Sequence, residues 1–184
     1  MKIQTFDIEG PRLCFLDAYS DQRGFFVERL RTSWLPEMKV LNQIDQLNFS
    51  RSEPNVLRGL HYQYDAPQGK LVTATRGRVF DVAVDIRANS PTFGQSVSVV
   101  LDGATPSWFW VPAGFAHGFL VIGNEPADVM YAVDTNYNGA GEGAIVWNDP
   151  DLAIKWPNEG PVNISGKDAA APTFKSYLAS PKFR

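Results

Sequence analysis

The sequence predicts an all-β fold of the β-sandwich or jelly-roll type. Short segments rich in Val, Phe, Tyr and Trp recur along the chain, and several alternate apolar with polar residues at the strand period of two. Turn signals containing Gly, Asn, Asp or Pro separate these segments, and long helical periodicity is almost absent. Many short strands joined by regular turns are typical of sandwiches and jelly rolls.

The expected strands follow one another closely along the chain. The clearest signal places Phe80 and Val82 on one face of a strand and Asp81 and Ala83 on the other. Helix is expected to be minor, with short pieces near residues 33–38, 149–153 and 171–178. In chain order, the expected strands are residues 25–31, 43–49, 56–63, 71–75, 79–86, 95–101, 107–111, 115–122, 129–134 and 144–147.

Size and composition fit a single globular domain, residues 1–184, with 44% hydrophobic and 20% charged residues. A formal net charge of −3 provides no basic field for nucleic acid. No apolar run reaches the length of a membrane span or of a signal-peptide core, so a cytoplasmic protein without a membrane partner is expected. The single Cys14 excludes an intrachain disulfide, and its apolar neighbours predict a buried residue without a catalytic role.

The chain contains only two histidines, His61 and His117, and each lies in a dense polar and aromatic segment. Histidine is the side chain best suited to moving protons near neutral pH. Either residue taken alone could equally be a satisfied core histidine. Their rarity and their settings favour proton chemistry.

Further polar residues are ambiguous when taken singly. Arg58 lies three residues before His61, so alternation puts the two on opposite faces unless Gly59 marks a bulge or bend. Gln46 and Asn48 share one face of the preceding strand. By local context, Arg23 and Glu28 could be surface groups, Lys70 a solvated lysine at a strand start, Tyr131 a core residue and Asp168 a helix N-cap.

The segment around the second histidine, Pro112-x-Gly114-x-x-His117, resembles the second half of the cupin motif. In metal-binding cupins the first half supplies a His-x-His pair, whereas here His61 is followed by Tyr62 and Gln63. With so few nitrogen ligands, a metal-free barrel with a histidine base is the expected arrangement.

Longer motifs resemble the dTDP-4-dehydrorhamnose 3,5-epimerase family, in order and over nearly the whole chain from about Asp7 to Pro172. These motifs are Asp21-Gln22-Arg23-Gly24-Phe25-Phe26-Val27-Glu28, Gln46-Leu47-Asn48-Phe49-Ser50, residues 57–63, Gln68-Gly69-Lys70-Leu71-Val72, residues 80–87, Ser90-Pro91-Thr92-Phe93-Gly94, residues 114–119, Trp147-Asn148-Asp149-Pro150 and Lys167-Asp168.

The resemblance implies a cupin-type jelly roll, a homodimer, no cofactor, and conversion of dTDP-4-dehydro-6-deoxy-D-glucose to dTDP-4-dehydro-L-rhamnose. It matches His61 to the base, Asp168 to its carboxylate partner and Tyr131 to the general acid. Many relatives carry two adjacent tyrosines where Asn136 precedes Tyr137 here, the candidate for stacking on thymine. The resemblance places Lys70 and His117 at the sugar, and it assigns substrate binding to Arg23, Glu28, Gln46, Leu47, Asn48, Arg58, Glu142 and Lys167.

Elementary chemistry agrees with these roles, because a 4-keto group acidifies the C–H bonds at C3 and C5. A neutral imidazole can remove the proton, a cationic lysine can stabilise the enolate, and a tyrosine can return a proton from the opposite face. Three alternatives remain open. They are a single-carbon epimerase or 4-keto-hexose isomerase on the same barrel, a non-catalytic module that binds a sugar nucleotide, and a metal-dependent cupin oxygenase.

Overall fold

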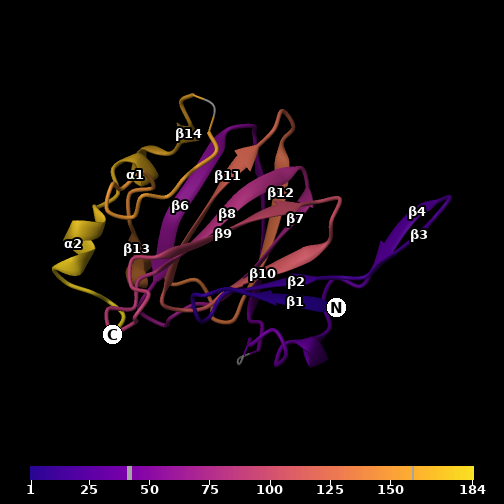
Figure 1. The fold of residues 1–184 in the computed structure, drawn as a ribbon, viewed down its shortest axis with the longest axis horizontal. Helices are drawn as coiled ribbons and strands as arrows, with labels where there is room; N and C mark the ends of the chain where they lie inside the picture. Colours follow the sequence, from indigo (N-terminus) through magenta and orange to yellow (C-terminus); the bar gives the residue numbers. More distant parts are fainter. Residues whose placement is uncertain (41–42, 159) are drawn as a thin grey trace.

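Two β-sheets face each other in the computed structural model, which describes residues 1–40, 43–158 and 160–184 (Figure 1). The first sheet has the strand order β1 (Lys2–Thr5), β2 (Arg12–Phe15), β10 (Ser107–Val111), β7 (Lys70–Arg76), β12 (Ala127–Val133) and β5 (Gln46–Ser52). The second has the order β13 (Glu142–Ala144), β6 (Val56–Gln63), β11 (Phe115–Ile122), β8 (Arg78–Asp85) and β9 (Ser96–Asp102), and β14 (Asn163–Ile164) pairs in parallel with β6.

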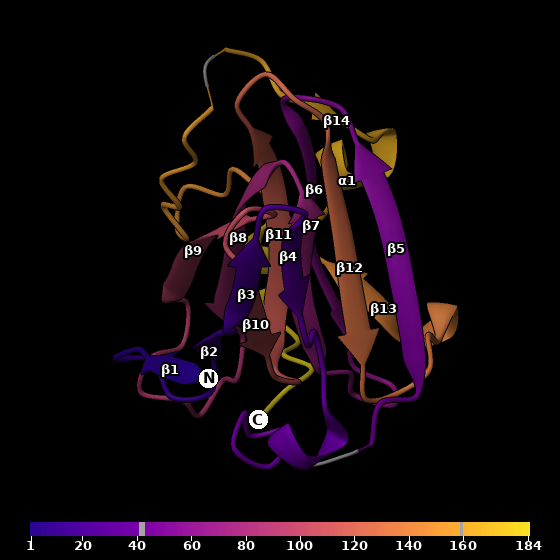
Figure 2. The same cartoon turned by 90° about the vertical axis from the view of Figure 1, so that its right-hand side faces the viewer.

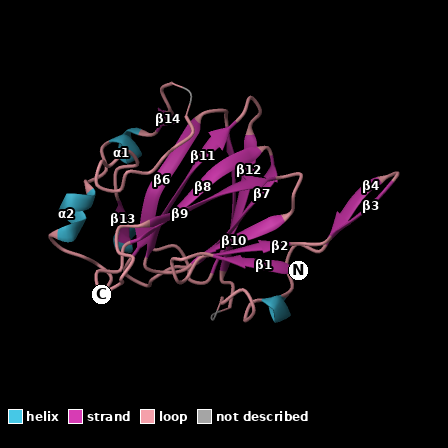
Figure 3. Cartoon of the chain, viewed as in Figure 1, coloured by secondary structure: helices cyan, strands magenta, loops and turns pink. Residues whose placement is uncertain are grey.

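Helix is a minor component, which confirms the predicted all-β, cupin-type jelly-roll class (Figure 3). The described α-helices are α1 (Gly166–Ala169) and α2 (Phe174–Leu178), and short 3-10 turns occur at Thr32–Trp34 and Gly139–Gly141. No helix in the described part of the chain is long and apolar enough to cross a membrane.

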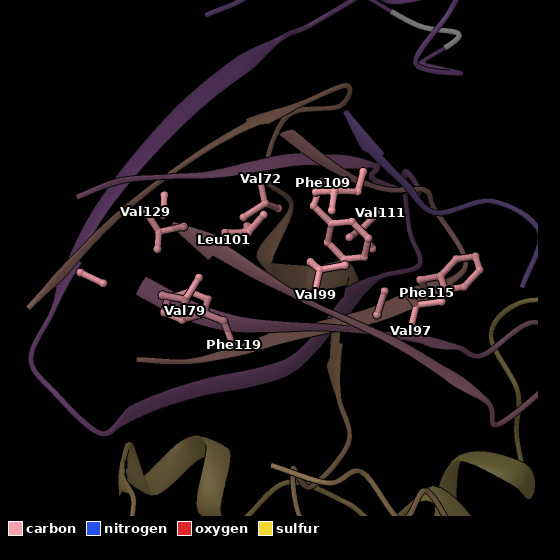
Figure 4. Close-up of a cluster of buried hydrophobic side chains, with 14 of the residues drawn as sticks. Val72, Val79, Val97, Val99, Leu101, Phe109, Val111, Phe115, Phe119 and Val129 are labelled. Carbon is pink, nitrogen blue, oxygen red and sulfur yellow. The ribbon is translucent and has the colours of Figure 1, made fainter. Parts of the chain in front are cut away.

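Packing between the two sheets forms the main hydrophobic core. Side chains from facing strands meet there, including Val72 and Phe109 of the first sheet and Val79, Val99 and Phe119 of the second (Figure 4). The central strand β8 is buried along most of its length, because the C-terminal segment with α2 packs on the outer face of its sheet. Its Asp81 and Asp85 are therefore removed from water, which the alternation in the sequence did not reveal.

The hairpin of β3 (Ala18–Asp21) and β4 (Gly24–Val27) projects away from the body of the barrel (Figure 1) and overlaps the barrel when the molecule is turned by 90° (Figure 2). All four residues of β3 and most of β4 are exposed, so this hairpin has no buried face to set an alternating pattern. The sequence therefore missed β3, and the strand expected at residues 25–31 ends at Val27.

Other predicted elements differ from the structure in bounds or type. The strand expected at 43–49 is β5 at Gln46–Ser52, and the helix expected at 33–38 is wrong beyond the 3-10 turn Thr32–Trp34. The edge strands β1 and β2 were missed, because four residues each give too short a pattern. The strand expected at 144–147 is wrong beyond Ala144, where β13 ends. The helix expected at 149–153 is also wrong: these residues form turns, in which Asp149 accepts a hydrogen bond from the backbone N–H of Asp151.

Candidate active site

Two adjoining cavities are lined by strands of both sheets. The larger measures about 640 Å³ and the smaller about 330 Å³. Four side chains from four different strands line both cavities, so the two form one continuous site: His61, Lys70, Tyr131 and Glu142.

His61 of β6 pairs with Asp168 of α1 at this site. Nε2 of His61 lies 2.8 Å from Oδ1 of Asp168, whose other oxygen accepts the backbone N–H of Gly59 at 3.2 Å. A carboxylate only accepts hydrogen bonds, so Nε2 carries the imidazole proton and Nδ1 keeps the lone pair. The Ser165 side chain caps α1, so Asp168 is not the cap and its carboxylate is available to the histidine.

The electrostatic surroundings keep His61 neutral at physiological pH. Burial lowers the pKa of His61 below its ordinary value, although the hydrogen bond and the negative charge of Asp168 act in the opposite direction. The positive charge of Lys70 lowers this pKa further. A neutral imidazole held by a carboxylate is the state that a general base requires.

An irregularity in β6 brings Arg58 and His61 into the same cavity. Gly59 has a φ of +124°, and a Cβ atom there would lie 2.5 Å from the Cα of Gly118 on β11. The register between β6 and β11 shifts beside this close approach. Both Arg58 and His61 line the larger cavity, so the bulge that the sequence left open is present.

His117 lies directly opposite His61 in the ladder between β11 and β6. Its Nε2 is 2.8 Å from Oδ1 of Asp81, a fully buried residue of β8. The cavity thus has two histidine–aspartate pairs side by side in one wall. His117 also lines the larger cavity.

Lys70 and Tyr131 bring further proton-bearing groups to the site. Burial lowers the pKa of Lys70 to about 8, against the opposing negative charges of Glu142 and Asp81. The Lys70 Nζ donates to the backbone carbonyl of His61 at 3.5 Å. Burial raises the pKa of Tyr131, with the positive charge of Arg58 acting against it, so the phenol keeps its proton at neutral pH.

Polar groups of the two cavities bond to one another. Lys167 lines the larger cavity, Tyr137, Gln46 and Asn48 line the smaller one, and Glu142 lines both. Nζ of Lys167 donates to Glu142 Oε2 at 2.5 Å, and the Tyr137 hydroxyl donates to the same oxygen at 3.2 Å. The Gln46 side chain accepts the backbone N–H of Tyr137 at 3.1 Å and donates to Asn48 at 2.7 Å. These predicted binding residues therefore lie together, although they come from three separate segments of the chain.

Three of the predicted binding residues do not line either cavity within this chain. Leu47 lies on the opposite face of β5 from Gln46 and Asn48 and is 61% exposed. Arg23 is at the tip of the projecting hairpin, where it pairs with Asp21, and Glu28 follows the hairpin and pairs with Arg31. Their binding roles stay predictions.

The structure adds residues to the site that the sequence reasoning missed or used differently. Ser50 lines the larger cavity, and its hydroxyl is buried without a hydrogen-bond partner among the described residues. The polar alternation of Gln46 and Asn48 continues through Ser50 to Ser52, which accepts a hydrogen bond from Arg58 at 3.0 Å. This continued alternation is the sequence signal that could have identified Ser50 and Ser52 as site residues.

Asp81 was placed by the sequence only on one face of its strand, whereas here it bonds to His117. Across the described ranges, no three His, Cys, Asp or Glu side chains group as a metal site. Whether the protein works without a metal stays a prediction.

Known proteins resemble this chain closely in sequence and in structure. The sequence model of the dTDP-4-dehydrorhamnose 3,5-epimerase family matches residues 5–176. A relative of that name from Salmonella typhimurium is 46% identical over 87% of this chain and 88% of its own length. Another from Neisseria gonorrhoeae is 44% identical over 89% of this chain, which spans only 51% of that longer protein.

Among solved structures, dTDP-6-deoxy-D-glucose-3,5-epimerase from Legionella pneumophila, in complex with dTDP-4-keto-L-rhamnose, superposes with a TM-score of 0.94 at 43% identity. The alignment covers 100% of this chain and 98% of that one. The match of the family model over nearly the whole sequence and the agreement of the folds lead to the same assignment. This chain belongs to the dTDP-4-dehydrorhamnose 3,5-epimerase family.

Proposed function

We propose that this chain inverts C3 and C5 of dTDP-4-dehydro-6-deoxy-D-glucose and releases dTDP-4-dehydro-L-rhamnose. The observation that carries the proposal is the placement of a base and an acid on facing sheets. His61, held by Asp168, is on β6 of the second sheet, and Tyr131 is on β12 of the first. Both side chains line the same cavities, so a sugar ring between them would have one proton carrier on each face.

Each inversion proceeds through an enolate. Nδ1 of His61 removes the proton from the carbon next to the 4-keto group, and the electron pair of the broken C–H bond moves onto O4. The ammonium of Lys70 stabilises the negative oxygen, because a fixed charge acts strongly in a site with little water. Tyr131 then donates its phenolic proton to the same carbon from the opposite face. Solvent reprotonates the phenolate and takes the proton from the imidazolium, so the cycle has no net oxidation.

The proposed site of the nucleotide comprises the smaller cavity together with the part of the larger cavity that Arg58 and Lys167 line. Arg58 and Lys167 are the cations placed to meet the pyrophosphate, and Tyr137 offers an exposed ring on which thymine can stack. Gln46 and Asn48 supply amide groups next to that ring. Glu142 holds Lys167 and Tyr137 through one carboxylate oxygen, which orients both groups before the substrate arrives.

A homodimer in the cytoplasm completes the proposal. The projecting hairpin exposes Tyr19, Phe25 and Phe26 at 57–68%, an apolar surface that water disfavours and a second copy could cover. Docking of this hairpin on a partner would also bring Arg23 toward a cavity that it does not reach in its own chain. Sedimentation velocity tests the association, and a monomer at micromolar concentration would contradict it.

Proton NMR of the substrate incubated with the enzyme in deuterated water tests the reaction itself. Deuterium should enter at both C3 and C5, and signals of the inverted sugar should follow. Exchange at one carbon only would identify a single-carbon epimerase. Binding of dTDP without any exchange would indicate a module that holds the sugar nucleotide but does not transform it.

A further inference from the structure

Asp81 is a carboxylate enclosed within the second sheet. It has no exposed surface, and one of its oxygens lies 2.8 Å from Nε2 of His117. The other oxygen is buried and has no hydrogen-bond partner among the residues that the structure describes. A buried negative charge is costly unless a positive charge lies nearby to balance it.

Lys70 is the cation that faces Asp81 across the space between the sheets. Lys70 shares the inner face of β7 with Val72, and Asp81 shares the inner face of β8 with Val79 and Ala83. Burial favours the neutral amine of Lys70 and lowers its pKa to about 8, and the negative charges of Glu142 and Asp81 oppose this effect. The titratable groups that line the larger cavity with Lys70 are Arg58 and His61 on β6, His117 on β11, Tyr131 on β12, Glu142 on β13, and Lys167 and Asp168 on α1. Asp81 on β8 lies behind His117, outside this lining.

We propose that Asp81 is a positioning residue, which fixes the His117 ring in the cavity wall and, together with Glu142, supplies negative charge that keeps Lys70 an ammonium. Asp81 does not line either cavity, so it acts only through His117 and Lys70. The consequence for catalysis rests on the proposed function, in which charged Lys70 stabilises the enolate. The interaction itself is a property of the folded protein and can be measured without substrate.

The first test follows the titration of Lys70 by NMR in protein labelled with ¹³C and ¹⁵N in lysine. Wild-type Lys70, identified by the loss of its signal in Lys70→Gln, should titrate with a midpoint near 8. In Asp81→Asn, which keeps the size of the side chain but removes its charge, the midpoint should fall by about one pH unit. An unchanged midpoint would overturn the proposal.

Asp149→Asn is the matched control. Asp149 is also buried, at 3% exposure, but it accepts the backbone N–H groups of Phe174 and Asp151 and does not line the cavities. Its replacement removes one buried charge elsewhere in the fold and should leave the Lys70 midpoint in place. A similar fall in both variants would mean that the effect is general loosening, and the proposal would fail.

Two further measurements keep the test decisive if Asp81→Asn folds poorly. Asp81→Glu retains the charge, so Lys70 should titrate close to its wild-type midpoint. In the wild-type protein, the ¹⁵N spectrum of the two histidines should show the His117 proton on Nε2, bonded to Asp81. A neutral His117 with its proton on Nδ1 would exclude that bond and with it the positioning role.

Rates of substrate exchange then connect the interaction to catalysis. The alkaline limit of the exchange rate should move to lower pH in Asp81→Asn by the same interval as the Lys70 midpoint, while Asp149→Asn keeps the wild-type profile. If the wild-type protein exchanges no substrate protons, the proposed function fails, and the Lys70 titration still decides the role of Asp81. If the midpoint moves but the alkaline limit does not, the catalytic part of the inference is wrong.

Discussion

The two histidine–aspartate pairs in the cavity wall have the same bond length and different surroundings. Both pairs have an Nε2–Oδ1 distance of 2.8 Å, and the histidines face each other across neighbouring strands. The side chain of His61 is 29% exposed, whereas that of His117 is 10% exposed. A catalytic base must reach both the substrate and the solvent, because it takes a proton from one and passes it to the other. A histidine–aspartate pair therefore does not identify the base by itself, and the greater exposure of His61 is the feature that distinguishes it.

The two carboxylates also differ in how they are held. Asp168 comes from α1, 107 residues from His61 in the chain, and both of its oxygens have donors, from His61 and from the backbone of Gly59. Asp81 comes from the strand next to His117, and a single described donor contacts it. A carboxylate bonded at both oxygens orients an imidazole for proton transfer, whereas Asp81 retains a charge that can act on Lys70.

The largest expected effect separates the two histidines directly. His61→Asn should abolish deuterium exchange at both C3 and C5, because a general base contributes roughly 10² to 10⁴ in rate. His117→Asn should reduce exchange by a smaller factor, since it changes the wall of the sugar site and leaves the base. The measurement is the initial exchange rate by NMR in deuterated water, with dTDP affinity as the check on folding. Equal losses of exchange rate in both variants would contradict the functional distinction between the two histidines.

The second prediction sharpens the assignment of His61 by removing the acid opposite to it. In Tyr131→Phe, His61 can still form the enolate and let substrate protons exchange with solvent, but inversion lacks its proton donor. Deuterium from the solvent should therefore enter the substrate faster than the inverted product appears, whereas His61→Asn should lose both exchange and inversion. One NMR time course gives both rates. Complete loss of exchange in Tyr131→Phe, or full epimerisation, would contradict the two-face mechanism.

The strands that carry the two histidines were predictable from sequence, because clear turn residues bound them. The predicted segments 56–63 and 115–122 coincide with β6 and β11. Asn55 and Gly114, which immediately precede these strands, adopt positive φ angles of 61° and 88° that end the preceding segment. Local patterning therefore predicted the scaffold of the site well.

Contacts between distant segments were not predictable in this way. No spacing rule connects Asp168 to His61, and the family resemblance alone suggested their pairing. Asp81 was visible as a polar residue in an apolar strand, but alternation could not show that both faces of β8 are buried. Of the exposed hairpin, the sequence predicted only part of β4 and missed β3, because neither face of the hairpin packs on the barrel.

The third prediction concerns Arg58, which shares β6 with His61 and has no counterpart beside His117. Arg58→Ala should weaken dTDP binding by about 1.5 to 3 kcal/mol, the usual range for a hydrogen bond to a charged group, or roughly 10- to 150-fold. Isothermal titration calorimetry measures this constant, and Arg78→Ala, an exposed arginine paired with Asp102, is the control. Unchanged affinity in Arg58→Ala would place the pyrophosphate elsewhere.

The smallest expected effect is on the pH dependence of the exchange rate, which should change about tenfold for each pH unit outside the working range of the enzyme. This dependence tests which histidine titrates during turnover. The base must be neutral, and burial lowers the pKa of His61, so the exchange rate should fall with acid only below about pH 6.5, the ordinary histidine value. Lys70 must be charged, so the rate should also fall as pH rises above about 8.

His117→Asn is the variant that assigns the acid limit of this profile. If His61 is the base, the variant should keep that limit while its overall rate drops, because His61 and Asp168 remain in place. The profile of kcat/KM reports the free enzyme, so it is the quantity to compare. An acid limit that disappears with His117 would show that the more deeply buried histidine titrates, and the distinction drawn from exposure would then be wrong.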